Sequence, residues 1–138
     1  MRNLGLLIMF LSVLVIISCD KDEDEVSERF RFLTSVEWES DQLLVNSEDA
    51  SGPGEMLEDF KGSVKFNEDG TGSFGQYSGT WQFAKSETEL VITTEALGFP
   101  LTTIIHELTK TDLKVATAFP NPANPEEPLN IEMSFKAK

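Results

Sequence analysis

A repeated alternation of apolar and polar side chains, with a period of two residues, limits what this chain can fold into more than any other feature. The alternation is clearest in the segment 129–136, whose apolar members are Leu129, Ile131, Met133 and Phe135. Successive side chains of a β-strand point to opposite faces, so this pattern puts one face in an apolar core and the other in water. Similar alternation or short β-branched runs predict strands at 37–45, 61–67, 71–76, 78–83, 89–94, 102–108, 113–119 and 129–136.

The segments between the predicted strands have the composition of turns. Gly70 ends the turn 67–70 at the position where a hairpin needs a positive φ, and 109–112 is a short polar turn. The segment 29–34 is predicted to form one short helical turn that offers apolar residues to the core. Eight antiparallel strands in sequence order can remove their exposed edges by closing into a barrel. We therefore predict an all-β fold, an eight-stranded up-and-down antiparallel β-barrel with a short N-terminal helical turn.

The amino-terminal segment differs in composition from the rest of the chain. An apolar run at 4–17 leads to the only cysteine, Cys19, and is shorter than the roughly 20 residues that span a bilayer. Acidic residues follow it, where a spanning helix would have a basic stop-transfer segment. We predict a lipoprotein signal peptide at 1–18, a lipidated cysteine and acidic tether at 19–28, and one domain at 29–138. An ordinary secretory signal and an uncleaved membrane helix are the alternatives.

The residues around Cys19 resemble two signals of bacterial lipoproteins. The sequence Ile-Ile-Ser-Cys at 16–19 is similar to the lipobox, which implies that Cys19 is lipidated and becomes the first residue of the mature protein. Two or three acyl chains on one residue make a stable membrane anchor. The acidic string at 20–25 resembles the export signal of Bacteroidetes lipoproteins, which implies the outer face of the bacterial outer membrane. The alternative is a solvated spacer on a protein that faces the periplasm.

The charge of the chain excludes one class of partner. The sequence has 11 basic and 24 acidic residues, and Arg2 alone among them lies in the predicted signal peptide. Ten basic against 24 acidic side chains give the mature protein a net charge of −14. Such a field repels polyanions, so no nucleic-acid partner is expected. With Cys19 used for lipid attachment, the mature protein has neither a disulfide nor a thiol catalyst.

Several motifs along the predicted strands resemble one family. They are Trp38 at the start of the first strand and the segments 64–72 (VKFNEDGTG), 79–83 (GTWQF), 89–93 (ELVIT) and 105–109 (IHELT). These motifs are similar to the lipocalin-like domains of small Bacteroidetes lipoproteins, over most of residues 30–138. The resemblance implies a calycin-like barrel that binds a small apolar molecule.

The lengths of the connections predict where a binding site lies. Successive connections of an up-and-down barrel alternate between its two ends. The three long connections, 46–60, 95–101 and 120–128, are the first, fifth and seventh, so they share one end. We predict an open mouth framed by these loops, with both chain ends at the opposite end. Loops on a rigid scaffold usually carry binding.

Six side chains are the candidate ligand-binding residues: Phe66, Phe74, Trp81, Phe99, His106 and Phe119. A small apolar ligand would enter the mouth and rest against them, in a cavity above about 300 Å³. The alternative is a barrel filled by the same aromatic side chains. Its acidic loops would then contact another protein, as an interaction or inhibitor-like module.

Catalysis finds little support in the sequence. His106 is the only histidine and is most simply a partly buried strand residue with hydrogen-bonded ring nitrogens. One histidine cannot supply a nucleophile, base and orienting group, so we expect no enzyme and no cofactor. The acidic residues of the first long loop have no histidine or cysteine beside them, so we expect no metal site either.

Overall fold

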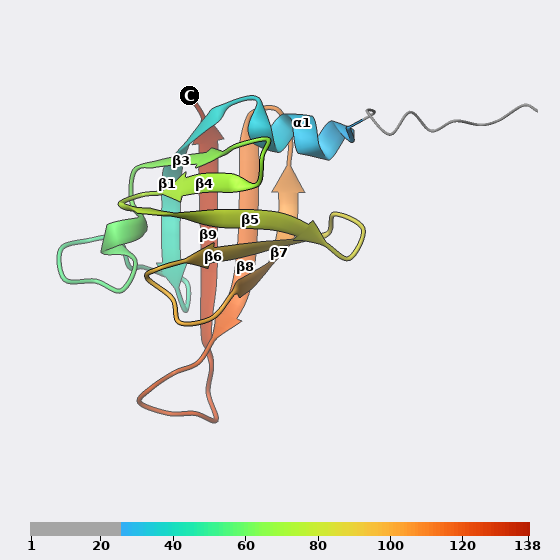
Figure 1. The fold of residues 1–138 in the computed structure, drawn as a ribbon. Helices are drawn as coiled ribbons and strands as arrows, with labels where there is room; N and C mark the ends of the chain where they lie inside the picture. Colours follow the sequence, from blue (N-terminus) through green and yellow to red (C-terminus); the bar gives the residue numbers. More distant parts are fainter. Residues whose placement is uncertain (1–25) are drawn as a thin grey trace, which may run out of the picture.

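The computed structural model describes residues 26–138, and the predicted signal peptide, Cys19 and most of the predicted tether lie outside the described residues. In the described part, eight strands pair antiparallel in chain order, and β1 also pairs with β9, which closes the sheet into a barrel (Figure 1). The predicted eight-stranded up-and-down barrel is therefore confirmed, with strand ends that differ from the prediction by at most two residues. The barrel strands are β1 (Glu37–Val45), β3 (Ser63–Phe66), β4 (Thr71–Phe74), β5 (Tyr77–Ala84), β6 (Glu89–Thr94), β7 (Leu101–Leu108), β8 (Asp112–Phe119) and β9 (Leu129–Ala137).

Strand β1 changes partner halfway along its length. Its first three residues pair with β3, and its last two pair with the short strand β2 (Glu48–Asp49). Asn46 and Ser47 form the turn between β1 and β2, with φ of 51° and 68°, the left-handed values of a tight hairpin. On its other side β1 pairs with β9, with a bulge between Ser40 and Gln42. The first long connection, predicted as a loop, thus begins as a hairpin that folds back along β1.

A short helix, α1 (Glu28–Thr34), covers one end of the barrel, which is termed the base (Figure 1). The Ser27 hydroxyl caps the helix by accepting a hydrogen bond from a backbone N–H of its first turn. Leu33 is fully buried, and the indole N–H of Trp38 donates to its carbonyl oxygen. The helix begins one residue before the predicted turn at 29–34, in the segment predicted as tether. No helix in the described part of the chain has the length and hydropathy of a membrane span.

Large side chains at the inward-facing strand positions fill the barrel. The predicted alternation appears directly in the burial of β9, whose buried residues are Ile131, Met133 and Phe135. The ring of Phe66 lies 5.5 Å from that of Phe74 and 5.7 Å from that of Trp81, edge-on in both cases. Such edge-to-face pairs are favourable beyond their buried area. The aromatic core therefore occupies the interior just above the base.

Candidate functional site at the mouth of the barrel

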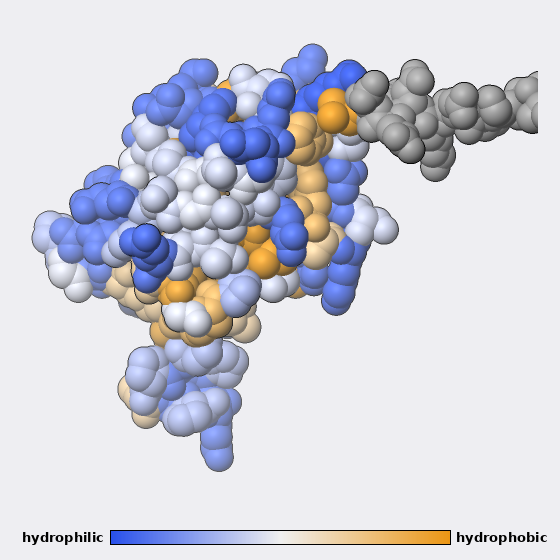
Figure 2. All heavy atoms as spheres, viewed as in Figure 1, coloured by the Kyte–Doolittle hydropathy of each residue, from blue (hydrophilic) through white to orange (hydrophobic). Residues whose placement is uncertain are grey.

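The three long connections meet at the end of the barrel opposite α1, as predicted (Figure 1). This end is termed the mouth. The connection after β1 holds the one-turn helix η1 (Glu58–Phe60), and the connections after β6 and β8 complete the ring. The carboxyl-terminal residue lies at the base, the end that α1 covers. Figure 2 shows hydrophilic residues over the loops and apolar residues gathered where the loops meet the body of the barrel.

A pocket of about 220 Å³ opens at the mouth. It is termed the mouth pocket. The first connection contributes Met56 and Leu57, the fifth contributes Leu97, and Phe119 stands where the seventh begins. The phenol of Tyr77 forms a polar part of the wall. Because the first and fifth connections supply apolar wall residues, the pocket exists only when these two loops are in place.

A second, smaller space lies deeper in the barrel and is termed the lumen cavity. It measures about 30 Å³, room for a few water molecules at most. It shares wall residues with the mouth pocket, so the two spaces are neighbours; the shared residues are Phe60, Leu97, Leu101 and Met133. Neither space reaches the 300 Å³ or so expected for a carrier, because aromatic side chains and α1 fill the lower half of the barrel.

The first long connection is held over the mouth by backbone hydrogen bonds. Ala50 N–H donates to the Leu43 carbonyl at 2.9 Å, and Leu57 N–H donates to the Ala50 carbonyl at 2.8 Å. Leu57 is consequently only 4% exposed, although its neighbour Met56 is 44% exposed. Further along, Gln76 N–H donates to the Asp59 carbonyl at 3.1 Å. The connection therefore narrows the opening and places Leu57 in it.

Five of the six predicted site residues fall into two groups. Phe66, Phe74 and Trp81 are buried in the core. Phe119 lines the mouth pocket, and the ring of Phe99 lies 5.8 Å from it on the rim. The first group fills the barrel, while the second group stands where a ligand would enter.

The sixth residue, His106, is exposed on the outer surface, so the prediction of a partly buried residue facing the ligand is wrong. In a strand with unbroken alternation, the buried Leu108 would place the side chains of His106 and Ile104 on the inward face of the barrel. The pairing of β7 with β8 has a bulge between Ile105 and Glu107, which shifts the alternation by one residue. Ile105 is therefore the inward residue, and Ile104 is 52% exposed.

Sequence reasoning missed Thr94, at the end of β6. It lines the lumen cavity at a position that continues the inward alternation of Leu90 and Ile92. Its hydroxyl is the one buried side-chain polar atom within residues 26–138 that lacks a hydrogen-bond partner. The comparable buried residue Thr103 donates its hydroxyl to the Leu90 carbonyl at 2.9 Å. The alternation signal was present, but a threonine in a strand carries no functional pattern by itself.

Polar contacts organise the carboxylates at the mouth. The Tyr77 hydroxyl donates to Asp59 at 3.0 Å, and this hydrogen bond raises the pKa of Tyr77. Hydrogen bonds from the hydroxyl and backbone N–H of Ser51 lower the pKa of Asp49. Within the part of the chain that the structure describes, no three His, Cys, Asp or Glu residues gather closely enough to hold a metal ion.

Comparison with known proteins assigns no family to this chain. The sequence matches no protein-family model and no curated protein.

Proposed function

We propose that this protein is a lipid-anchored, non-enzymatic binder of a small apolar molecule, which it holds in the mouth pocket. One observation carries the proposal: two loops and several strand ends, far apart in sequence, converge on one concave space of about 220 Å³ and line it with apolar side chains. Small-molecule sites are typically concave and mostly apolar, with a few polar groups that orient the ligand. The mouth pocket has this composition, with Tyr77 as a polar group in its wall.

The anchoring part of the proposal is that the lipid on Cys19 holds the protein at the bacterial outer membrane, on its outer face. The described chain enters the barrel through α1 at the base, opposite the mouth (Figure 1). An anchor that precedes α1 would therefore leave the mouth facing away from the membrane. This arrangement fits a lipocalin-like lipoprotein that takes its ligand from the surroundings rather than from its own bilayer.

The proposal includes no chemical step. His106 is not part of the wall of the mouth pocket, and it stands on the outer face of the sheet. The pocket wall is apolar apart from the phenol of Tyr77. Binding without catalysis is the use that these side chains support.

A second candidate function is a protein-interaction module, and the small lumen cavity favours it. A cavity of about 30 Å³ is far too small for an apolar ligand, so the barrel itself is a filled scaffold. In that case the loops at the mouth would contact a protein surface, and a small apolar probe would not bind.

The test is a titration with N-phenyl-1-naphthylamine, a neutral apolar probe whose emission rises when it leaves water. Ala96 lines the mouth pocket and is exposed, so Ala96→Trp fills the pocket at little cost to the fold. Ile104→Trp, on the outer face, is the matched control. We expect saturable binding to the wild type and to Ile104→Trp, and loss of binding in the pocket-filling variant Ala96→Trp. Equal emission from all three proteins, or none, would refute binding in the mouth pocket.

A further inference from the structure

Apolar side chains reach the surface beside α1, in an open depression between the helix, β5 and the turn 67–70. This depression is termed the base groove. Figure 2 shows apolar residues extending from the point where the described chain begins along this side of the molecule. The aromatic wall residues of the base groove are Phe30, Trp81 and Phe83, and its exposed polar wall residues are Glu68, Asp69 and Gln82.

The three aromatic rings of the base groove pack against one another and are partly open to water. The ring of Trp81 lies 5.7 Å from that of Phe30 and 5.4 Å from that of Phe83. Trp81 is buried, and its indole N–H donates to the Asn67 carbonyl at 2.9 Å, so its polar atom is satisfied. Phe30 and Phe83 are half-buried, and Val26, just before α1, is 42% exposed. Clustered apolar surface of this kind is typical of a contact with a partner or a membrane.

The base also differs in charge from the rest of the domain. The segments at this end are 26–37, 67–70, 85–88, 109–112 and 136–138. They hold six basic and six acidic side chains, so their charges cancel. Residues 26–138 as a whole have 9 basic and 19 acidic side chains, a net charge of −10, all of which therefore lies outside the base segments. The base is consequently the end that meets least repulsion at a lipid surface, and its mixed charges match headgroups that carry both signs.

The position of the chain before α1 indicates which surface the base meets. The predicted lipid attachment site, Cys19, precedes Val26 by seven positions. Seven residues span at most about 25 Å, so a lipid on Cys19 would hold the base close to the bilayer. A linker this short gives two joined sites an effective concentration in the millimolar range. A base that binds lipid with a Kd of only about 1 mM would therefore be docked for much of the time.

We propose that the base groove and Val26 dock on the lipid surface to which the protein is anchored. The exposed parts of Phe30, Phe83 and Val26 enter the interfacial region, where apolar and aromatic side chains are favoured. The basic and acidic side chains of the base meet the phosphate and ammonium groups of zwitterionic headgroups. This contact goes beyond the ligand site at the mouth and rests on the anchoring part of the proposed function. It holds the barrel in one orientation, with the mouth outward.

The test uses the lipidated mature protein in vesicles of phosphatidylcholine and phosphatidylethanolamine. Lipidation consumes the thiol of the only cysteine, so an introduced cysteine is the single site for a thiol-reactive nitrobenzoxadiazole label. Gln82→Cys places the label in the base groove, and Ala123→Cys places it on the connection after β8 at the mouth; both positions are exposed. We expect nitroxide-labelled lipids to quench the label at position 82 several-fold more strongly than the label at position 123. Equal quenching at the two positions would overturn the proposal.

Substitutions in the docking surface locate the contact. Val26→Ser removes apolar surface at an exposed position and should lower the ratio of docked to undocked protein a few-fold. Phe83→Ser should lower it further. Ile104→Ser, at a position 52% exposed on the outer face, is the matched control and should leave the quenching at position 82 unchanged. The midpoint of thermal unfolding checks the fold of each variant, and Val26→Ser decides alone where Phe83→Ser does not fold. Unchanged quenching in Val26→Ser and in a folded Phe83→Ser would overturn the proposal.

The outcomes separate docking from the anchoring on which it rests. If the protein sediments with the vesicles and neither label is quenched, the domain is tethered without docking, so this proposal fails and the anchoring stands. If the protein does not sediment with the vesicles, the anchoring fails and docking fails with it. If the emission of the label at position 82 shifts to the blue only as protein density rises, without quenching by the lipid nitroxides, a second copy covers the base groove and the proposal is overturned.

Discussion

The indole N–H of Trp38 donates a hydrogen bond to the carbonyl oxygen of Leu33 at 3.0 Å, and both side chains are fully buried. Trp38 stands in β1, while Leu33 belongs to α1. This contact is one of several that join the helix to the barrel, and it satisfies a carbonyl near the carboxyl end of α1. The base is thereby closed, and any ligand must use the mouth.

Replacing Trp38 tests how much the closed base contributes to stability. Trp38→Phe leaves the Leu33 carbonyl without its donor, which should lower the free energy of unfolding by about 1–3 kcal/mol. Trp38→Ala adds a cavity and should cost about 3–5 kcal/mol. Urea denaturation followed by circular dichroism measures both. Ile104→Ala, at an exposed site, should stay within about 0.5 kcal/mol of the wild type. A Trp38→Phe protein as stable as the wild type would contradict the role of this hydrogen bond.

We expect the side chain of Leu57 to limit the volume of the mouth pocket. Its side chain is buried by the first connection, so Leu57→Ala should destabilise the protein by about 2 kcal/mol or more. The same truncation enlarges the mouth pocket and should raise the affinity for N-phenyl-1-naphthylamine. Met56→Ala is the control, because Met56 is its exposed neighbour and should change stability little. If both variants behave alike in denaturation, the first connection does not pack as described.

Gly75 permits the close approach between the third and the first connections. It has a φ of 61°, and a Cβ there would lie 2.3 Å from the Asp59 carbonyl oxygen. Gly75→Ala should therefore cost more than about 1 kcal/mol and loosen the connection that carries η1. Gly98→Ala is the matched control, since a Cβ at Gly98 meets nothing within 4 Å. Hydrogen exchange of the Gln76 amide, which donates to Asp59, reports the loosening; unchanged protection would contradict the prediction.

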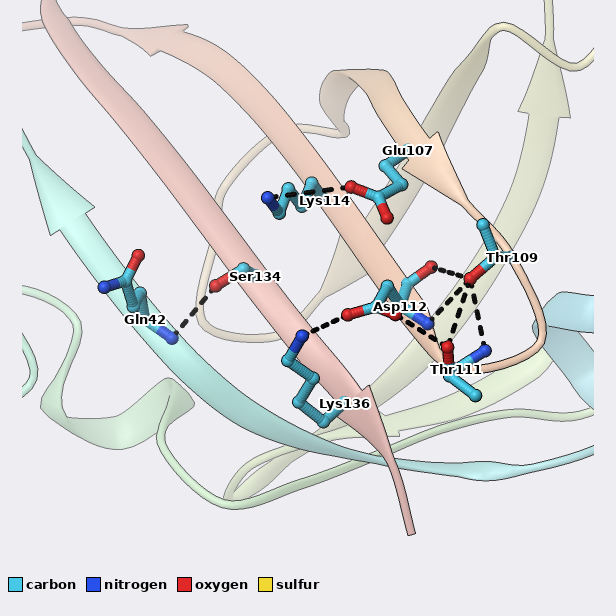
Figure 3. Close-up of polar contacts among 8 residues, drawn as sticks. All are labelled: Gln42, Glu107, Thr109, Thr111, Asp112, Lys114, Ser134 and Lys136. Carbon is cyan, nitrogen blue, oxygen red and sulfur yellow. Dashed lines mark hydrogen bonds and ion pairs between the residues drawn. The ribbon is translucent and has the colours of Figure 1, made fainter.

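The pair of Asp112 and Lys136 predicts a pH dependence of stability (Figure 3). The hydrogen bond from Lys136, followed by that from Thr111, lowers the pKa of Asp112 in the folded protein. A folded-state pKa below the unfolded value stabilises the fold above the unfolded pKa, near 4, and the stabilisation is lost as the pH falls through the folded pKa. Asp112→Asn should be less stable than the wild type at pH 7.

That difference between Asp112→Asn and the wild type should shrink as the pH falls below about 4. Urea denaturation at pH 7, 5, 4 and 3 measures it. In a Lys136→Met background the same substitution should have a smaller effect at pH 7, because the partner is gone. A difference that stays constant over the whole pH range would show that the carboxylate's charge is not what stabilises this contact.

Local periodicity explains why so much of the barrel was predictable. Strands β1 and β6 coincide with the predicted ranges 37–45 and 89–94, and β6 is a short β-branched run ended by polar residues. The hairpin at Asn46 and Ser47 was not predicted. Its left-handed turn contains no glycine, so the sequence offered only the weak signal of one asparagine.

The candidate site was predictable in its position and less so in its members. The lengths of the loops sufficed to place the mouth, since they depend only on the order of the strands. The face of His106 depended on a bulge in β7, which no pattern in the sequence marks. The missing partner of Thr94 depends on how its neighbours pack, which emerges only in the folded barrel. Register and hydrogen-bond satisfaction are properties of several strands together.

The most direct test of the account is to locate a bound ligand on the domain. Amide chemical shifts in ¹H–¹⁵N spectra should be compared with and without N-phenyl-1-naphthylamine. We predict that the largest changes fall on the segments that line the mouth pocket, at Leu57, Leu97 and Phe119, while amides of α1 stay unchanged. Changes centred on the outer face around His106, or no saturable change at all, would contradict a binding site in the mouth.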